Sequence, residues 1–513
     1  MEKKIDWTKF LDKTVSATMK TIDISGKVLN KVNELTKDAT EIIHTPNIKV
    51  AVTGLQSSGK TVFILSLLQH IKYFQAERFP LIKGDDKYQI HEFKELPVPS
   101  NFEPFPFKEM WTNVFAAPEG KEWPNKTTET YLYSASFKYS GQWFANGKIK
   151  MDLLDFPGER FADVEIARSE DYVSWSDKII DQLKDEEKNY NGKKKVEDKK
   201  EYVKKYLDEI KENSLSRPIP QFWIESYKKL MTLLKIDIRS NFITPSSFLL
   251  DYENKSMFSA ENDEPNNGRD RFCGLRSGEF VPLPADIRDK YPAEVADMGE
   301  NYSVYREKVV KKLFDYLNEC SHIILTVDIL GTLYLGVQRY NSLTDILMSW
   351  GEMFKPNKIF SLSENLKKLA VVGTKKDMTV TADHPNMNHL LEQIKTMLER
   401  QHKKIKYASF CVSAWRSTTD AERYRYLIGK RARHRAGETI ELRADGQEEW
   451  PIGYPVPKEW PADWDPGYLD QDKPNAEPKP KFVYPLTKPS PIKNTKTPPD
   501  QSGMGDVFLF IVD

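Results

Sequence analysis

The segment from Val50 to Leu67, VAVTGLQSSGKTVFILSL, constrains the fold more than any other part of the chain. It begins with apolar, β-branched residues that predict a buried strand, and it ends in a helical pattern. Between them lies Gly54-Leu55-Gln56-Ser57-Ser58-Gly59-Lys60-Thr61, which fits the pattern G-x-x-x-x-G-K-[ST]. Glycines there let backbone N–H groups turn inward, and the helix N-terminus adds partial positive charge. The segment therefore predicts an anion-binding loop in a strand–loop–helix unit of an α/β fold.

Charge and composition exclude several classes of protein. The chain has 513 residues, and 76 Lys and Arg balance 76 Asp and Glu. Nucleic-acid binding normally leaves an excess of positive charge, so nucleic acid is not an expected partner. The three cysteines are far apart, as in proteins of a reducing compartment. Apolar runs such as residues 322–330 have the length of strands and not of membrane spans. We expect a soluble, cytoplasmic protein.

The loop residues predict a site for a nucleoside triphosphate and Mg²⁺. Lys60 would reach the β- and γ-phosphates, and the Thr61 hydroxyl would be a ligand of Mg²⁺. The residues expected to surround the phosphates are Gly54, Gln56, Ser57, Ser58, Gly59, Lys60 and Thr61.

A second motif supplies the other side of the metal. Asp155-Phe156-Pro157-Gly158 ends an apolar strand and fits D-x-x-G. Asp155 would hold Mg²⁺ through water, and the Gly158 N–H would contact the γ-phosphate. Upstream, Asn146-Gly147 predicts the tight turn of an antiparallel hairpin, which is typical of the Ras-like GTPase branch. In that branch a loop threonine closes on Mg²⁺, and here we favour Thr127 over its neighbour Thr128.

A third motif predicts which base is read. Thr374-Lys375-Lys376-Asp377 follows an apolar strand and fits [NT]-K-x-D. The Asp377 carboxylate would accept two hydrogen bonds from guanine, a donor pair that adenine lacks, while the stem of Lys375 covers the ring. One strand later, a backbone N–H of Ser413-Ala414 would meet guanine O6, although Trp415 stands where a lysine is usual. The expected cofactors are GTP or GDP with Mg²⁺.

The residues that would support hydrolysis are less defined. Glu159 stands where Ras-like enzymes place a glutamine, and its carboxylate would either activate water or repel the γ-phosphate. Arg160 would be a charge stabiliser in cis or half of a surface ion pair. The loop residues Gln56 and Ser57 offer another route, as in dynamin-type GTPases. The catalytic candidates are Lys60, Glu159, Gln56 and Thr127, and we expect slow hydrolysis.

Several segments, taken in their order along the chain, resemble one family. They are VAVTGLQSSGKTVFI, WPNKT, LLDFPGER, CGLRSGEFVPLP, IILTVDILGTLYLG and VVGTKKD. The chain resembles the YcjX-like proteins, which are bacterial P-loop GTPases of the Ras-like branch that are often associated with stress responses. The resemblance implies an α/β Ras-like P-loop domain, mainly parallel with one antiparallel hairpin, and a large helical insertion. It implies nucleotide and metal contacts for Lys60, Thr61, Thr127, Asp155, Gly158, Thr374, Lys375 and Asp377.

The chain divides into five expected parts with different patterns. Strands are expected at 323–330, 369–374 and 407–413, whereas 75–126 reads as irregular. The parts are N-terminal amphipathic helices (1–46), the first part of the G domain (47–165), a mostly helical insertion (166–310), the second part of the G domain (311–444) and a Pro- and Trp-rich wrap with a docking segment (445–513).

Three other functions stay open at this point. The chain could be a dynamin-like GTPase with peripheral contact to the inner membrane. It could be a scaffold that holds nucleotide without turnover, or an ATPase. The protein effector is unknown.

Overall fold

The computed structural model describes the following residues: 46–54, 58–100, 102–116, 130–141, 146–155, 158–184, 193–211, 219–236, 244–247, 279–337, 339–341, 343–344, 347–348, 365–401, 403–432, 440–452, 455–461, 482, 484, 487–492 and 494–513. The predicted N-terminal helices therefore lie outside the described residues, apart from residue 46.

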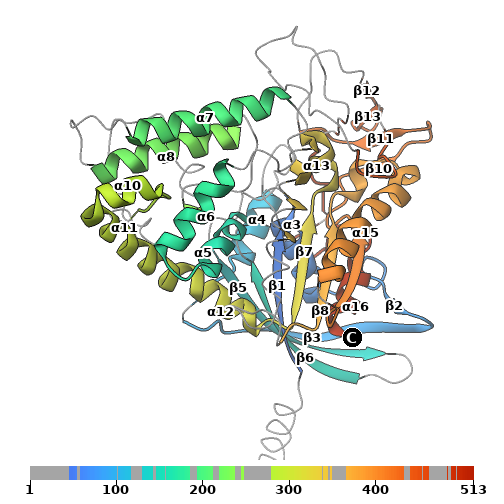
Figure 1. Cartoon of the computed structure of the whole chain (residues 1–513). Coiled ribbons are helices and arrows are strands. Elements are labelled where there is room, and N and C mark those ends of the chain that lie inside the picture. The colour runs from blue at the N-terminus through green and yellow to red at the C-terminus, as the bar shows by residue number, and fades with distance from the viewer. Residues whose placement is uncertain are drawn as a thin grey trace, which may run out of the picture.

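A mainly parallel sheet forms the centre of the described part (Figure 1). Its strand order is β2-β3-β5-β6-β1-β7-β8-β9, and β4 pairs with β5. Strands β6, β1, β7, β8 and β9 are parallel to one another, whereas the pairs β2–β3, β3–β5 and β5–β6 are antiparallel and the short β4 is parallel to β5. The bounds are β1 Asn47–Gly54, β2 Leu81–Lys83, β3 Asp86–Leu96, β4 Glu103–Pro104, β5 Tyr131–Gly141, β6 Asn146–Asp155, β7 His322–Val327, β8 Lys368–Gly373 and β9 Lys406–Cys411.

Both faces of the parallel strands are buried, as their continuous apolar sequences require. Val50 and Val52 belong to one core, with α3 (Lys60–Lys72) and α16 (Met504–Val512). Ala51 belongs to the other core, with α13 (Ile329–Leu335) and α15 (His384–Gln401). The alternation of side chains along β1 thus separates two helical layers.

The second core continues into a large group of helices, shown in green and yellow at the upper left of Figure 1. They follow the D-x-x-G strand through a 3₁₀ turn, Gly158–Asp163, and return to β7. Their bounds are α5 Val164–Arg168, α6 Tyr172–Lys184, α7 Lys193–Lys211, α8 Ile219–Ile236, α10 Ala285–Lys290, α11 Pro292–Tyr305 and α12 Lys312–Glu319, with a π-helical segment Arg306–Lys311 before α12. None of the helices that the structure describes is both long and apolar enough to cross a membrane.

A small antiparallel sheet lies beyond β9, at the upper right of Figure 1. Its order is β10-β11-β13-β12, from Thr418–Asp420, Tyr426–Gly429, Glu448–Pro451 and Glu441–Leu442 respectively. β13 pairs with β11 across the boundary expected at 444/445. The five-part division remains a prediction.

The predicted α/β fold with a mainly parallel sheet is confirmed, and the predicted antiparallel hairpin β5–β6 is joined by a second, β2–β3. Three local predictions are wrong. Residues 75–126 include β2, β3, β4 and α4 (Phe107–Ala116). The long strand β3 was hidden because it is largely exposed and its register shifts between His91 and Lys94, which breaks the period of two.

The Asn146-Gly147 pair is inside the ladder and not in the turn. The two residues pair with Ser140 and Tyr139 in the β5–β6 hairpin. A Cβ on Gly147 would lie 2.7 Å from the Tyr139 ring, so this glycine makes room for a cross-strand side chain.

The strand expected to reach Leu330 ends at Val327, because Asp328 caps a helix. Its Oδ1 accepts a hydrogen bond from Gly331 N at 2.8 Å, which starts α13.

Candidate nucleotide-binding site

The two glycines that flank the segment between β1 and α3 have the positive φ angles that the motif predicts. Gly54 has φ 147°, and a Cβ there would lie 2.2 Å from the carbonyl oxygen of Thr326 on β7. Gly59 has φ 81° and is the N-cap of α3. Only glycine tolerates the contact at Gly54, so the loop passes close to the neighbouring strand.

Lys60 reaches back to the end of β1. Its Nζ donates to the Gly54 carbonyl at 3.0 Å, and the residue is 8% exposed. Ser58 Oγ lies 2.7 Å from Thr326 Oγ1, which fastens the loop to β7. The ammonium group is therefore held at the mouth of the loop, next to the N-terminus of α3. Gln56 and Ser57 lie outside the described residues.

The predicted metal residues start from adjacent elements at the same edge. Asp155 ends β6, is fully buried and pairs in register with Val52 of β1. Thr61 is in the first turn of α3. Hydroxyl and carboxylate oxygens are the donors that Mg²⁺ prefers, so these two residues fit the metal. Gly158 begins the next 3₁₀ turn, whereas Thr127 and the side chain of Glu159 lie outside the described part.

Thr374 joins the candidate base-reading loop to the candidate phosphate loop. Its Oγ1 donates to the Ser58 carbonyl at 2.8 Å, and the residue is 3% exposed. Next along the chain, Lys375 has φ 62° and pairs through Nζ with Asp328 Oδ2. The same Asp328 caps α13, so the position of this ammonium group is set by the end of β7.

The Asp377 carboxylate is bonded on both oxygens. Ser413 Oγ donates to Oδ1 at 2.7 Å, and the backbone N and Oγ of Ser417 both donate to Oδ2 at 2.7 Å. The side chain is half-buried. This places the guanine-reading candidates Asp377 and Ser413 in direct contact.

The C-terminal segment holds the loop that contains Ser413 and Ala414. Ser413 and Ser502 exchange two backbone hydrogen bonds of 2.9 Å, and Ala414 O accepts from Ser66 on α3. Trp415 is buried, donates from Nε1 to Ser490 O at 3.0 Å and packs with its ring centroid 5.4 Å from that of Trp111. A lysine at this position would lose these contacts, which explains the departure from the usual motif.

Two residues of the site were missed from the sequence. Asp328 gave a weak signal, since it is a polar residue directly after an apolar strand. Ser417 gave none, because nothing in its neighbourhood marks it as a partner of Asp377.

Arg160 is not at the surface. It is 6% exposed, donates from Nη1 to Tyr305 Oη at 2.8 Å and Ser246 Oγ at 3.2 Å, and lies 3.7 Å from Asp163 Oδ2. Burial raises the pKa of Asp163, and the Arg160 charge opposes that shift. The prediction of a surface ion pair for Arg160 is therefore wrong. Arg160 connects the segment after D-x-x-G to the helical insertion.

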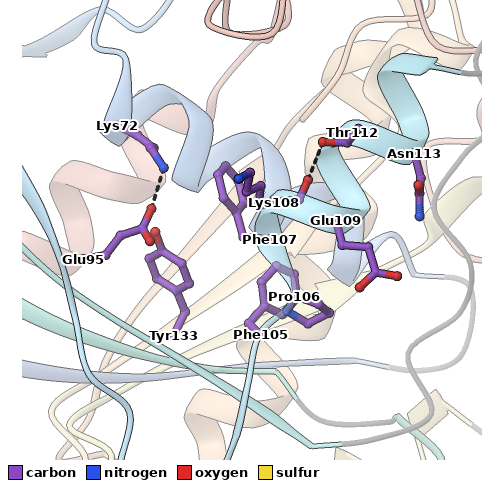
Figure 2. A pocket seen from close by; sticks show the side chains of 10 residues that line it. All are labelled: Lys72, Glu95, Phe105, Pro106, Phe107, Lys108, Glu109, Thr112, Asn113 and Tyr133. Atoms are coloured by element: carbon purple, nitrogen blue, oxygen red, sulfur yellow. Dashed lines mark hydrogen bonds and ion pairs between the residues drawn. The ribbon is translucent and has the colours of Figure 1, made fainter.

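A separate pocket of about 550 Å³ lies at the other end of α3 (Figure 2). Lys72 pairs there with Glu95, and Phe105, Phe107 and Tyr133 line its apolar side. Lys72 is twelve positions after Lys60 on α3, which is roughly 18 Å along a helix. The pocket contains none of the predicted nucleotide residues.

The strand order, the glycine loop and the paired base-reading loops define a Ras-like P-loop domain with a helical insertion. The profile of the YcjX-like family, DUF463, matches residues 48–464, and the chain belongs to that family. Over 372 residues it is 24% identical to a protein of Escherichia coli (strain K12) named Ras-like GTPase YcjX, covering 68% of this chain and 73% of the relative.

Proposed function

We propose that this protein binds guanine nucleotide with Mg²⁺, hydrolyses GTP slowly and acts as a nucleotide-dependent switch. One observation carries the proposal: the Thr374–Ser58 hydrogen bond of 2.8 Å joins the loop that reads the base to the loop that holds the phosphates. The name of the Escherichia coli relative supports the same function.

At the phosphate end, Lys60 leaves the Gly54 carbonyl for the β- and γ-phosphates, and the N–H groups at the start of α3 donate to them. Thr61, Asp155 and Thr127 are the residues that would hold Mg²⁺. When bound, this ion neutralises charge that develops between the phosphates. Gly158 N–H contacts the γ-phosphate, so the 3₁₀ turn that it begins is the part that responds to hydrolysis.

At the base end, Asp377 accepts from guanine N1–H and the 2-amino group. The stem of Lys375 lies over the ring, and the backbone at Ser413 and Ala414 donates to guanine O6. Adenine offers no donor pair to the carboxylate, so the site selects guanine.

Hydrolysis is the slower part of the proposed cycle. Glu159 and Gln56 are the candidates for orienting the attacking water, and a carboxylate at Glu159 repels the γ-phosphate when ionised. Arg160 is held by Tyr305 and Ser246, so it would have to leave a buried site to act in cis. A role in bacterial stress belongs to this proposal through the family resemblance alone, and peripheral contact with the inner membrane belongs to the dynamin-like alternative. The protein effector is unknown.

Nucleotide titration tests the proposal directly. Fluorescent GDP is bound to the protein in Mg²⁺ and displaced with GTP, GDP, ATP or XTP. We expect GTP and GDP to compete and ATP to fail. Lys60→Ala should weaken binding by about a hundredfold, since charge-assisted phosphate contacts are lost. Asp377→Asn should shift preference toward xanthine.

Matched controls separate the site from general effects of charge. Lys72→Ala removes a lysine from the far end of the same helix, and Asp506→Asn changes an exposed aspartate of α16. Both should bind GDP as the wild type does. Equal competition by ATP would overturn the guanine assignment. Nucleotide that co-purifies without turnover would favour a scaffold, and liposome-stimulated turnover would favour a dynamin-like GTPase.

A further inference from the structure

The donors around Asp377 lead to an inference that rests on the proposed function and concerns its specificity. We infer that the Ser417 hydroxyl occupies an acceptor site that guanine needs, and that it releases this site by turning its proton toward Thr487. Ser417 is thus a specificity-determining residue that weakens recognition of the guanine 2-amino group.

The argument begins with the capacity of the carboxylate. Two ionised oxygens offer about four lone-pair sites in all. Three are taken by Ser413 Oγ on Oδ1 and by the N–H and hydroxyl of Ser417 on Oδ2. Guanine brings two donors, N1–H and the 2-amino group, so one protein donor has to leave.

The Ser417 hydroxyl is the donor that can leave at least expense. Its backbone N–H is fixed by the loop, whereas a hydroxyl proton rotates about the Cβ–Oγ bond. The Ser413 hydroxyl can rotate as well, but among the described residues its side-chain partner is Asp377, whereas Ser417 Oγ also lies next to Thr487 Oγ1. Rotation of one hydroxyl requires no movement of either loop.

Thr487 supplies the alternative acceptor. Its Oγ1 lies 2.7 Å from Ser417 Oγ, and Ser417 and Thr487 are 3% and 1% exposed. Since an ionised carboxylate only accepts, the Ser417 hydroxyl donates to Asp377 in the observed arrangement, and Thr487 therefore donates to Ser417. When guanine arrives, this direction reverses: Ser417 donates to Thr487, and Oδ2 is left open for the base.

Two variants should act in opposite directions. Ser417→Ala removes the competing donor, so GDP should bind about five- to tenfold more tightly, since one hydrogen bond to a charged group is at stake. Thr487→Val keeps the shape but removes the alternative acceptor, so GDP should bind several-fold more weakly. IDP lacks the 2-amino group and needs one acceptor site, so its affinity should change in neither variant.

The experiment measures GDP, IDP and ADP affinities by competition for the wild type, Ser417→Ala, Thr487→Val and the double variant. Thr419→Ala, an exposed threonine two residues away, is the matched control and should match the wild type. In the double variant, Thr487→Val should add nothing to the effect of Ser417→Ala, because Thr487 acts on base recognition through the Ser417 hydroxyl, which is absent. Ser417→Thr, which restores the hydroxyl, should return the wild-type GDP-to-IDP ratio.

The outcomes separate this inference from the function on which it rests. If wild-type protein does not prefer GDP to ADP, the proposed function fails. Two results would overturn the inference while that preference holds. If Ser417→Ala weakens GDP binding, Ser417 only positions Asp377. If Ser417→Ala leaves the ratio of GDP to IDP affinity unchanged, Ser417 plays no part in base recognition.

Discussion

The two ends of the candidate site are assembled in different ways. At the phosphate end, the main contact joins Lys60 to Gly54, six residues away in the same motif. At the base end, Asp377 is held by Ser413 and Ser417, 36 and 40 residues further along. The first end is built mainly by one strand and the helix that follows it, with β7 and Thr374 as its contacts from further along the chain. The second exists only when distant segments, including the C-terminus, have packed together.

This contrast has a consequence for stability. A local loop tolerates little change in its own backbone but depends on few partners. A loop built from distant segments depends on many weak contacts, each of which contributes a small part. Single substitutions at the phosphate end should therefore change the free energy of unfolding or of nucleotide binding by a large amount. Single substitutions at the base end should change it by less, because each removes one of several contacts.

The largest expected effect is that of Gly54→Ala. Its Cβ would lie 2.2 Å from Thr326 O and the residue would keep φ 147°, so the strand or the loop must move. We expect a loss of at least about 3 kcal/mol in the free energy of unfolding, together with loss of GDP binding. Urea unfolding measures the first and the competition assay the second.

Gly84→Ala separates the close contact from backbone strain alone. Gly84 also has a positive φ, 61°, but a Cβ there meets nothing within 4 Å. We expect a loss of only about 1 kcal/mol, from the left-handed conformation. Equal losses in the two variants would show that the phosphate loop does not depend on its distance from β7.

A smaller effect should follow from acid, through the helix that carries the phosphate end. His70 of α3 is fully buried and its ring lies 4.8 Å from that of Phe79. Burial, with a contribution from Arg78, lowers the pKa of His70 from 6.5 to about 3. The folded protein thus keeps this histidine neutral, while the unfolded chain gains a proton below pH 6.5.

The contribution of the neutral, buried His70 to the free energy of unfolding is fully present above pH 6.5 and is lost as the pH falls from 6.5 toward 3. At pH 4.5 the decline should amount to about 2–3 kcal/mol. His70→Leu should remove that part of the pH dependence of urea unfolding, whereas substitution of the exposed His91 by Gln should leave it. An unchanged profile in His70→Leu would assign the acid sensitivity to other groups.

The same contrast decides what the sequence could predict. The loop from Gly54 to Thr61 was readable because its residue types are dictated by nearby backbone and by the ligand. The motif at Thr374–Asp377 was readable for the same reason. The partners of that motif were not, since Ser417 and Asp328 act across the fold and have no local pattern.

The errors in the fold have similar causes. The Asn146-Gly147 pair has the sequence of a tight turn, but the Tyr139 ring on the opposite strand requires the glycine inside the ladder. Arg160 lies close after D-x-x-G, and the sequence allowed it to be half of a surface ion pair. In the structure it is buried against Tyr305 and Ser246 of the insertion. In both cases a tertiary neighbour changed the meaning of a local pattern.

The smallest expected effect tests whether several distant contacts each contribute a small part of the binding free energy at the base end. Asp328→Asn keeps the cap on Gly331 N but removes the negative charge that faces Lys375. The Lys375 side chain is 29% exposed, so solvent screens the pair and its contribution is about 0.5–1 kcal/mol. We expect binding to weaken about threefold.

The pattern across bases is what distinguishes this residue from Ser417. In the proposed function the stem of Lys375 lies over the ring of the base. Every purine has a ring face, so Asp328→Asn should weaken the binding of GDP, IDP and XDP by the same factor. Asp315→Asn, which changes an exposed aspartate of α12, is the control and should leave all three affinities unchanged. A loss confined to GDP would mean that Asp328 acts on Asp377, and the base end would then be one coupled unit and not a sum of separate contacts.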